Sequence, residues 1–358
     1  MLKARRDFLY KVKDIKKLKG LEIGPLNKPL MKKEDTEKGG KISYLDHLSR
    51  EELIHKYRDD KSINVDEIVP VDYVCRDGNI TGAVAGKVFD YVVASHVIEH
   101  APNLLRFLLE VEHILKPGGY FIIIVPDKRF TFDVDRPITT FGEVLERFLQ
   151  KITQPCIASV YNHFSMATHA KAHNIWHGIV DPVDSRLLVS EKFAWDAAQK
   201  VFEQSEYYDV HVNVFTPASF FSILRRATLH KLTFFEVEYF RDTEIGQLEF
   251  MVLLKKRTNV SVGSDDKDFA GVFPKIDMEG HLSPYMPQVR SLSAALENIS
   301  ENNLKLNNEL EELKSNSFKR IKDLEGKVEI AQKMLDRKSV KLILLLLDRL
   351  YGFFRKRE

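Results

Sequence analysis

The chain has 358 residues, a formal net charge of +2 and 44% hydrophobic residues, which predict one large core with solvated appendages. So small a net charge does not indicate a nucleic acid partner. The two cysteines, Cys75 and Cys156, lie far apart without metal-ligand spacing, which favours a reducing, cytoplasmic compartment. We expect no signal peptide and no segment that spans a bilayer.

The first stretch, residues 3–19, combines many lysines and arginines with apolar residues at helical spacing. This pattern predicts a basic helix whose apolar stripe packs beside the first strand. Its lysines are predicted to form a solvent-exposed face of the helix. The alternative is attraction to anionic lipid or to a phosphorylated substrate.

A short apolar run at residues 21–24 ends in Gly24, and a second β-rich run at 41–46 ends in Asp46. A strand that ends in glycine lets the backbone approach a ligand closely. A carboxylate at the tip of the next strand, roughly 20 residues on, is placed to hydrogen-bond a ribose diol. The pair therefore predicts a nucleoside at the carboxyl edge of a parallel sheet. Pro25 stands where a dinucleotide turn needs glycine, which argues against NAD.

Further strands are predicted at residues 68–74, 89–95 and 120–125, with helices at 49–57 and 103–115. Ser49 with a glutamate three residues later predicts a capping box at the first of these helices. Continuous apolar strands alternating with helices indicate an α/β sheet covered on both faces, with its ligand at the carboxyl ends of the strands.

Residues 21–25, 89–100 and 115–119 resemble, in order and spacing, the motifs of class I S-adenosylmethionine (SAM) methyltransferases; Pro25 departs from the usual glycine. The resemblance extends over residues 18–257 and implies a Rossmann-like seven-stranded sheet that ends in an antiparallel hairpin. It implies S-adenosyl-L-methionine as cofactor. By position it implies cofactor contacts from Glu22, Gly24, Pro25, Asp46, Asp72, Tyr73, Ser95 and His96. The residue pattern on its own supports only Gly24 and Asp46.

Three stretches, 21–25, 44–53 and 126–137, are similar to bacterial methyltransferases associated with surface-polysaccharide biosynthesis. That narrower resemblance implies O-methylation of a sugar hydroxyl on a surface glycan or a lipid-linked oligosaccharide. A hydroxyl acceptor needs a general base. The candidates are His96, His100, Asp127 and His163.

An insertion at residues 127–208 is predicted to be mostly helical and to lie above the methyl donor, on the acceptor side. It places His169, His173 and His177 at a spacing of four residues. Such spacing can bind zinc, but a polar helix face is the preferred interpretation. We predict no metal site.

The methyltransferase domain is predicted at residues 1–257, followed by a linker at 258–288 and a coiled coil at 289–338 whose apolar residues recur every three and four positions. This seam predicts self-association as a dimer or trimer. Residues 339–358 predict a basic amphipathic helix that lies on an anionic membrane surface, at the inner face of the cell membrane. A helix that binds a protein partner is the alternative.

Two other functions remain open from the sequence. The first is a non-catalytic scaffold with a SAM-type fold that assembles a glycan-synthesis complex, since Pro25 replaces a motif glycine. The second is a methyltransferase for a small molecule or a lipid.

Overall fold

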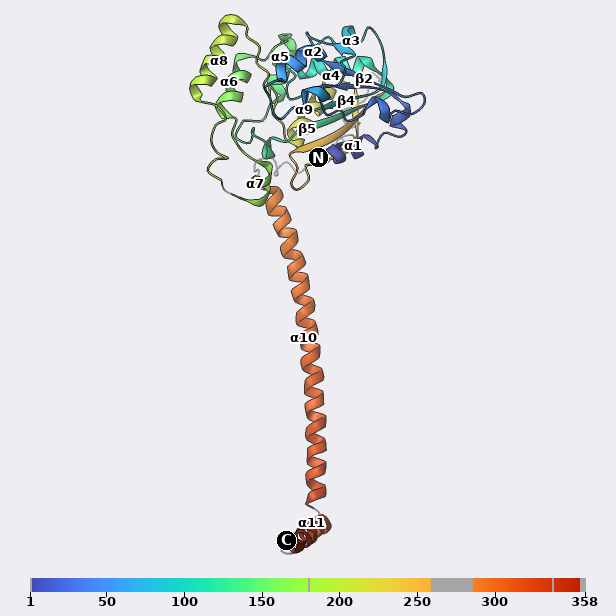
Figure 1. Ribbon diagram of the computed structural model, residues 1–358, viewed down its shortest axis with the longest axis vertical. Helices are drawn as coiled ribbons and strands as arrows, with labels where there is room; N and C mark the ends of the chain where they lie inside the picture. Colours follow the sequence, from blue (N-terminus) through green and yellow to red (C-terminus); the bar gives the residue numbers. More distant parts are fainter. Residues whose placement is uncertain (1, 180, 259–285, 337, 355–358) are drawn as a thin grey trace. The chain divides into compact units, whose positions relative to one another are not determined.

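The computed structural model describes residues 2–179, 181–258, 286–336 and 338–354, so most of the predicted linker lies outside the described residues. The chain divides into two compact units, Met1–Gln288 and Val289–Glu358. The first unit is an α/β domain, and the second is helical (Figure 1).

The centre of the first unit is a seven-stranded sheet with the order β3-β2-β1-β4-β5-β7-β6. Strands β1 to β5 run parallel, and β7 enters antiparallel between β5 and β6. The strands are β1 (Lys19–Ile23), β2 (Lys41–Asp46), β3 (Tyr73–Val74), β4 (Phe89–Ser95), β5 (Leu115–Pro126), β6 (Phe235–Arg241) and β7 (Glu249–Lys256). The predicted Rossmann-like sheet with a terminal antiparallel hairpin is confirmed.

Helices cover both faces of this sheet. The helices outside the insertion are α1 (Leu2–Leu9), α2 (Arg50–Tyr57), α3 (Ile80–Ala83), α4 (Leu104–Ile114) and α9 (Pro217–Leu229). Short 3-10 turns lie at η1 (Ile15–Lys17), η2 (Lys33–Asp35), η3 (Val65–Glu67) and η4 (Lys128–Phe130). The predicted capping box at α2 is present. Ser49 Oγ accepts a hydrogen bond from the Glu52 amide, and the Glu52 carboxylate accepts one from the Ser49 amide.

Alternating residues of the strands feed two separate hydrophobic cores, as expected for a sheet buried on both sides. On β4, Val92 and Ala94 face the core that α4 and α9 complete, whereas Tyr91 and Val93 face the core that α1 completes. Gly20 on β1 makes the second core possible. A Cβ there would lie 2.1 Å from Tyr91 Cζ, so only glycine lets this ring lie across the strand.

The described residues of the 127–208 segment contain α5 (Phe141–Leu149), α6 (Ile157–Met166), α7 (Ala172–His177) and α8 (Glu191–Gln204). Helices α6 and α8 lie side by side at one edge of the domain (Figure 1). A small core of its own holds them together, and its buried members are Val160, Ala197, Val210 and Val212.

Three local predictions are wrong. The N-terminal helix ends at Leu9 instead of continuing to residue 19, and Asp14 takes a left-handed conformation with φ +55° before η1 begins. The third strand is confined to Tyr73–Val74, so residues 68–72 of the expected run are not part of the strand. His169 precedes α7, so it does not share a helical face with His173 and His177.

The second unit consists of two helices, α10 (Met286–Leu335) and α11 (Lys338–Phe354). In the single chain the predicted seam of α10 is open to solvent, with Leu306 61% and Leu313 64% exposed. Among the described residues, no helix combines the length and the apolarity needed to cross a membrane.

Glu22 fastens the loop that follows β1. Its carboxylate is 2% exposed and accepts hydrogen bonds from the Leu30 and Met31 amides at 2.8 and 3.2 Å. Burial raises the pKa of Glu22 to about 7, although these two bonds and Arg6 oppose the rise. A carboxyl that bridges β1 and the loop is therefore close to half protonated at neutral pH.

Stability should fall as the pH rises through the pKa of Glu22. Because the folded chain holds this proton up to about pH 7 and the unfolded chain releases it near the ordinary value, folding is favoured at the acidic end of that window. One pH unit of displacement corresponds to about 1.4 kcal/mol. We expect the wild type to lose roughly 1–3 kcal/mol of unfolding free energy between pH 5 and pH 8 through this group, measured by urea denaturation.

The variant Glu22→Gln should remove that slope, and the exposed Glu34→Gln should leave it in place. Parallel pH profiles for the wild type and Glu22→Gln would show that the carboxyl ionises freely in the folded protein.

Candidate active site

A cavity of about 340 Å³ opens where strands β1, β2 and β4 end at their carboxyl edge. Its lining consists of Ile23, Gly24, Leu26, Leu45, Asp46, His47, Leu53, Tyr57, Cys75, Gly78, Ile80, His96, Val97, His100, Ala101, Phe107, Tyr207 and Asp209. Most of the wall is apolar, and few polar groups converge on it. This combination is typical of a site for a small organic ligand.

Gly24 forms the turn at the end of β1. It has φ +66°, and a Cβ there would lie 3.0 Å from Val97 Cγ2. Its amide donates to the Leu45 carbonyl at 2.9 Å, which ties the turn to the neighbouring strand. Leu26 also takes a positive φ of 47°, so two residues of this turn hold conformations that favour glycine. The backbone is thus brought to the cavity wall without a side chain at its closest point.

Asp46 ends β2 at the cavity, as the sequence predicts. The residue is 6% exposed, and its Oδ1 accepts from the amide of His47 and lies 2.7 Å from that residue's Nδ1. Within the described part of the chain, no hydrogen bond reaches Asp46 Oδ2. One carboxylate oxygen therefore remains for a ligand.

His96 follows β4 in a left-handed conformation with φ +55°, which is uncommon for a residue with a Cβ and concentrates at functional sites. Its Nε2 lies 2.7 Å from Glu249 Oε2, and Arg5, which binds the same carboxylate, places its Nη2 3.1 Å from that ring nitrogen. If Nε2 carries the proton that Glu249 accepts, the lone pair is on Nδ1. The hydroxyl of Ser95 next to it is buried without a hydrogen bond among the described residues.

His100 is the second imidazole of the cavity. Its Nδ1 lies 2.9 Å from Asp209 Oδ1, at ion-pair distance but without the alignment of a good hydrogen bond. Asp209 also binds Lys56 Nζ at 2.8 Å. Burial lowers the pKa of His100, but Asp209 and Glu99 more than compensate, so it lies above the ordinary value.

Behind His100 lies a polar group that the sequence did not reveal. His211 packs edge-to-face on His100 with ring centroids 4.8 Å apart, and its Nδ1 lies 2.5 Å from Asp133 Oδ2. Although burial raises the pKa of Asp133, His211 and Arg136 lower it to about 2. Both His211 and Asp133 come from irregular segments, one at each end of the insertion, and no periodic pattern marks them.

His163 lies on α6 next to this group but outside the cavity lining. Its Nδ1 accepts from the His211 amide at 3.3 Å. Burial and the nearby Arg136 lower the pKa of His163 to about 3. The imidazole is therefore neutral at pH 7, and it binds the backbone amide of His211 instead of lining the cavity.

Several predicted cofactor contacts do not line the cavity. Glu22 and Pro25 are not among its lining residues, and Glu22 holds the loop after β1. The Asp72 carboxylate accepts a hydrogen bond from the Tyr44 amide at 2.9 Å and forms an ion pair with Lys33. The Tyr73 hydroxyl accepts a hydrogen bond from Lys87 Nζ. Asp72 precedes β3, which spans Tyr73–Val74, and the residues after this strand that line the cavity are Cys75, Gly78 and Ile80.

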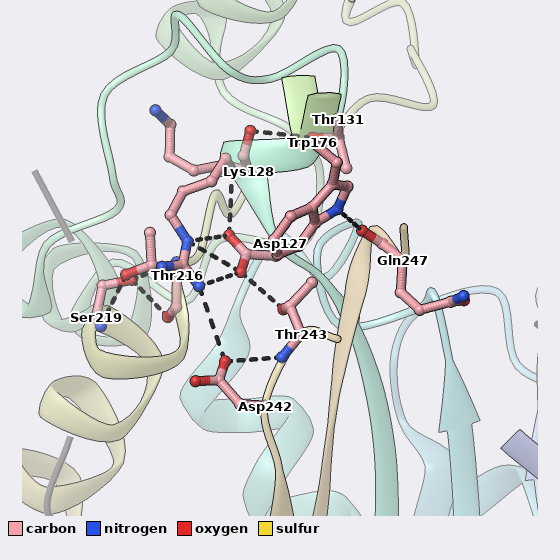
Figure 2. A network of polar contacts seen from close by, with 10 residues as sticks. Asp127, Lys128, Thr131, Trp176, Thr216, Ser219, Asp242, Thr243 and Gln247 are labelled. Atoms are coloured by element: carbon pink, nitrogen blue, oxygen red, sulfur yellow. Dashed lines mark hydrogen bonds and ion pairs between the residues drawn. The ribbon is translucent and has the colours of Figure 1, made fainter. Parts of the chain in front are cut away.

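Asp127 is not placed to act on a substrate. It is 0% exposed and holds Arg129 through two side-chain nitrogens, with Nη2 at 2.6 Å from Oδ2. Figure 2 shows Asp127 facing Thr243, whose Oγ1 donates to Oδ2 at 2.8 Å. The prediction that Asp127 faces the cleft is wrong, because this ion pair fixes the carboxylate between η4 and the β6–β7 connection.

A family model described as a methyltransferase domain matches residues 53–229. A search of curated proteins found no match. The chain is similar to the solved structure of a SAM-dependent methyltransferase from Aquifex aeolicus, at 13% identity and a TM-score of 0.34, over 70% of this chain and 88% of that one. It is also similar to a SAM-dependent methyltransferase from Methanosarcina mazei, at 15% identity and a TM-score of 0.34, over 68% of this chain and 93% of that one. Likenesses at this level carry no argument about the reaction.

The matched domain, the strand order and the cavity identify the chain as a SAM-dependent methyltransferase, with S-adenosylmethionine as its methyl donor. The cavity fits that cofactor. Gly24 leaves room where a Cβ would crowd Val97, and Asp46 keeps a carboxylate oxygen for a ribose diol. When bound, S-adenosylmethionine supplies a methyl group on a positively charged sulfur.

A stability measurement distinguishes a structural role of Asp127 from a role as general base. The change Asp127→Asn removes the closest counter-charge of the buried Arg129 guanidinium and leaves it the more distant, exposed Asp242 carboxylate at 3.8 Å, so we expect a loss of up to about 3–5 kcal/mol in unfolding free energy. Urea denaturation would measure it. The neighbouring, exposed Asp135→Asn should stay within about 0.5 kcal/mol of the wild type. Unchanged stability together with a collapse of turnover would instead make Asp127 the general base.

Proposed function

We propose that the chain transfers the methyl group to a hydroxyl oxygen, and that the acceptor is a sugar of a bacterial surface glycan or of a lipid-linked oligosaccharide. The observation that carries the oxygen acceptor is His96 at the cavity. A hydroxyl is a poor nucleophile until its proton is removed, and imidazole is the side chain suited to that near neutral pH.

His96 is better placed for this role than the other candidates. Its Nε2 is held by Glu249, and the nearest carboxylate to its Nδ1 is Glu99 Oε1 at 3.6 Å, beyond hydrogen-bond distance. His96 Nδ1 therefore takes the proton as the acceptor oxygen bonds to the methyl group. Asp46 and Gly24 hold the cofactor, and the apolar wall excludes water.

The glycan acceptor is supported by the resemblance of residues 21–25, 44–53 and 126–137 to methyltransferases of polysaccharide synthesis. The end of the helical insertion supports it too, because Tyr207 and the next residue but one, Asp209, line the cavity. A tyrosine ring and a carboxylate are groups that can pack on a sugar and accept its hydroxyl hydrogens.

Radiolabelled methyl transfer tests this function. Full-length protein with labelled S-adenosylmethionine should label lipid-linked oligosaccharides in a form that survives mild alkali, as a methyl ether does. His96→Asn should lower turnover by about 10²–10⁴-fold with little change in cofactor affinity. Asp46→Ala should weaken cofactor binding about tenfold to hundredfold, measured by isothermal titration calorimetry.

Label recovered in an alkali-labile ester, or on an amine, would contradict the hydroxyl acceptor. Label found only in simple lipids or small molecules would favour the alternative acceptor class. Cofactor that binds neither the wild type nor Asp46→Ala would leave the scaffold function.

We further propose that α10 joins copies of the chain in a coiled coil. Its seam residues recur at alternating intervals of three and four, and Ile299 and Leu306 are 55% and 61% exposed in the single chain. Burying such a stripe between helices stabilises an oligomer.

The mass of the protein checks this proposal. The full chain should sediment as a dimer or trimer, and protein ending at Arg257 as a monomer. Ile299→Asp with Leu306→Asp should dissociate the full chain, because two charges would enter the seam. Asn298→Asp with Asn308→Asp adds the same charge off the seam and should not. Equal masses for the full and shortened chains would rule the coiled coil out.

We propose that α11 lies on an anionic membrane surface. Leu342, Ile343 and Leu346 are among its exposed apolar residues, and basic residues follow at the chain's end. A helix with this composition suits the bilayer interface, and several copies on an oligomer would add avidity.

Vesicle sedimentation measures this binding. The full chain should pellet with anionic vesicles, bind less as salt rises, and stay in the supernatant once residues 339–358 are removed. Neutral vesicles serve as the control. If the full and shortened chains remain in the supernatant alike, α11 binds a protein partner instead.

A further inference from the structure

Three potential metal ligands meet beside the cavity, outside the residues used so far for the methyl donor. Glu99 and His100 follow β4, and His211 arrives from the segment after α8. One ligand atom from each lies within 4.8 Å of the others. A cation placed among them would contact a carboxylate oxygen and two imidazole nitrogens, a ligand set found at catalytic zinc sites that keep an open position.

The state of Glu99 points independently to a missing ligand. Its side chain is 0% exposed, and within the described residues neither carboxylate oxygen has a hydrogen-bond partner. The nearest basic group is His96 Nδ1 at 3.6 Å. Burying an unpaired carboxylate is costly, and buried charges in proteins are paired or bind metals. The backbone keeps Glu99 in place, because its carbonyl accepts from the Val212 and Asn213 amides.

A carboxylate lies beside Nδ1 of each imidazole. His211 Nδ1 lies 2.5 Å from Asp133 in a hydrogen bond, whereas His100 Nδ1 lies 2.9 Å from Asp209, at ion-pair distance without hydrogen-bond alignment. The hydrogen bonds of the described residues do not use Nε2 of either ring. A carboxylate behind one ring nitrogen fixes the tautomer and leaves the other nitrogen for a cation.

We propose that Glu99, His100 and His211 bind one divalent transition-metal cation of the zinc type. Two imidazoles favour such an ion over Mg²⁺, which prefers oxygen ligands. The Glu99 backbone bonds to residues 212 and 213 hold the two ligand-bearing segments together.

The position of the site gives the ion a function that rests on the proposed O-methylation. His100 lines the cavity, and a cation bound to it would present its open position toward the acceptor. A hydroxyl at that position becomes more acidic, which eases the transfer of its proton to His96. Sugars with neighbouring hydroxyls are the acceptors that such an ion would orient best.

Metal binding can be measured without the methyl transfer reaction. Tag-free full-length protein, stripped with a chelator and dialysed against Zn²⁺, should retain one zinc per chain by elemental analysis. Mg²⁺ at equal concentration should not displace it. Glu99→Gln and His211→Asn should each weaken Zn²⁺ at least 100-fold in competition with a chromophoric chelator. Asp133→Asn should weaken it about 10–100-fold, and the exposed His113→Asn should not change it.

Melting temperatures with and without Zn²⁺ distinguish a variant that has lost the metal site from a variant that folds poorly. Zn²⁺ should raise the melting temperature of the wild type but not that of Glu99→Gln, which should melt no lower than the metal-free wild type because it loses an unpaired buried charge. Zinc retained equally by wild type and both ligand variants, or by neither, would overturn the site. Zinc bound as predicted, without methylation of any sugar, would support the site and refute the proposed acceptor.

Discussion

The parallel pairing of β1 with both β2 and β4 is the constraint on which the site depends. Each strand ends at the same edge, so Gly24, Asp46 and His96, which are distant in sequence, share one cavity wall. The pairing is possible because Gly20 lets Tyr91 lie across β1. The hydrophobic effect thus sets the positions of the polar groups, since the same strands that bury the two cores carry the ligand-facing residues at their ends.

The position of the cavity edge was predictable where the end of a strand is marked in the sequence. Gly24 and Asp46 end apolar runs that are typical of strands, and both line the cavity. Asp72 was misplaced because β3 is a short edge strand, where the apolar pattern does not fix the register. Asp127 also ends a strand, but Arg129 two residues later captures its carboxylate. The periodicity of apolar residues predicts where a strand ends, but it does not predict which residue pairs with a buried charge.

The acceptor half was not predictable for a different reason. His211, Asp133 and Asp209 lie in irregular segments at the two ends of the insertion, and their meeting depends on tertiary packing. Of the four proposed bases, only His96 and His100 line the cavity. Both follow β4, the most regular strand of the sequence. Each imidazole has a carboxylate beside it, Glu249 at His96 and Asp209 at His100. These carboxylates orient the two rings.

The two ends of the insertion are joined at its base, where the Thr139 amide donates to the Val214 carbonyl and Lys128 to Phe215. Closing a loop at its stem makes its interior length nearly neutral in entropy. The region between depends on this stem and on its own small core, while its helix α5 packs into the core of the sheet through Val144. The two stem segments stay paired whatever the length of the helical segment that they carry.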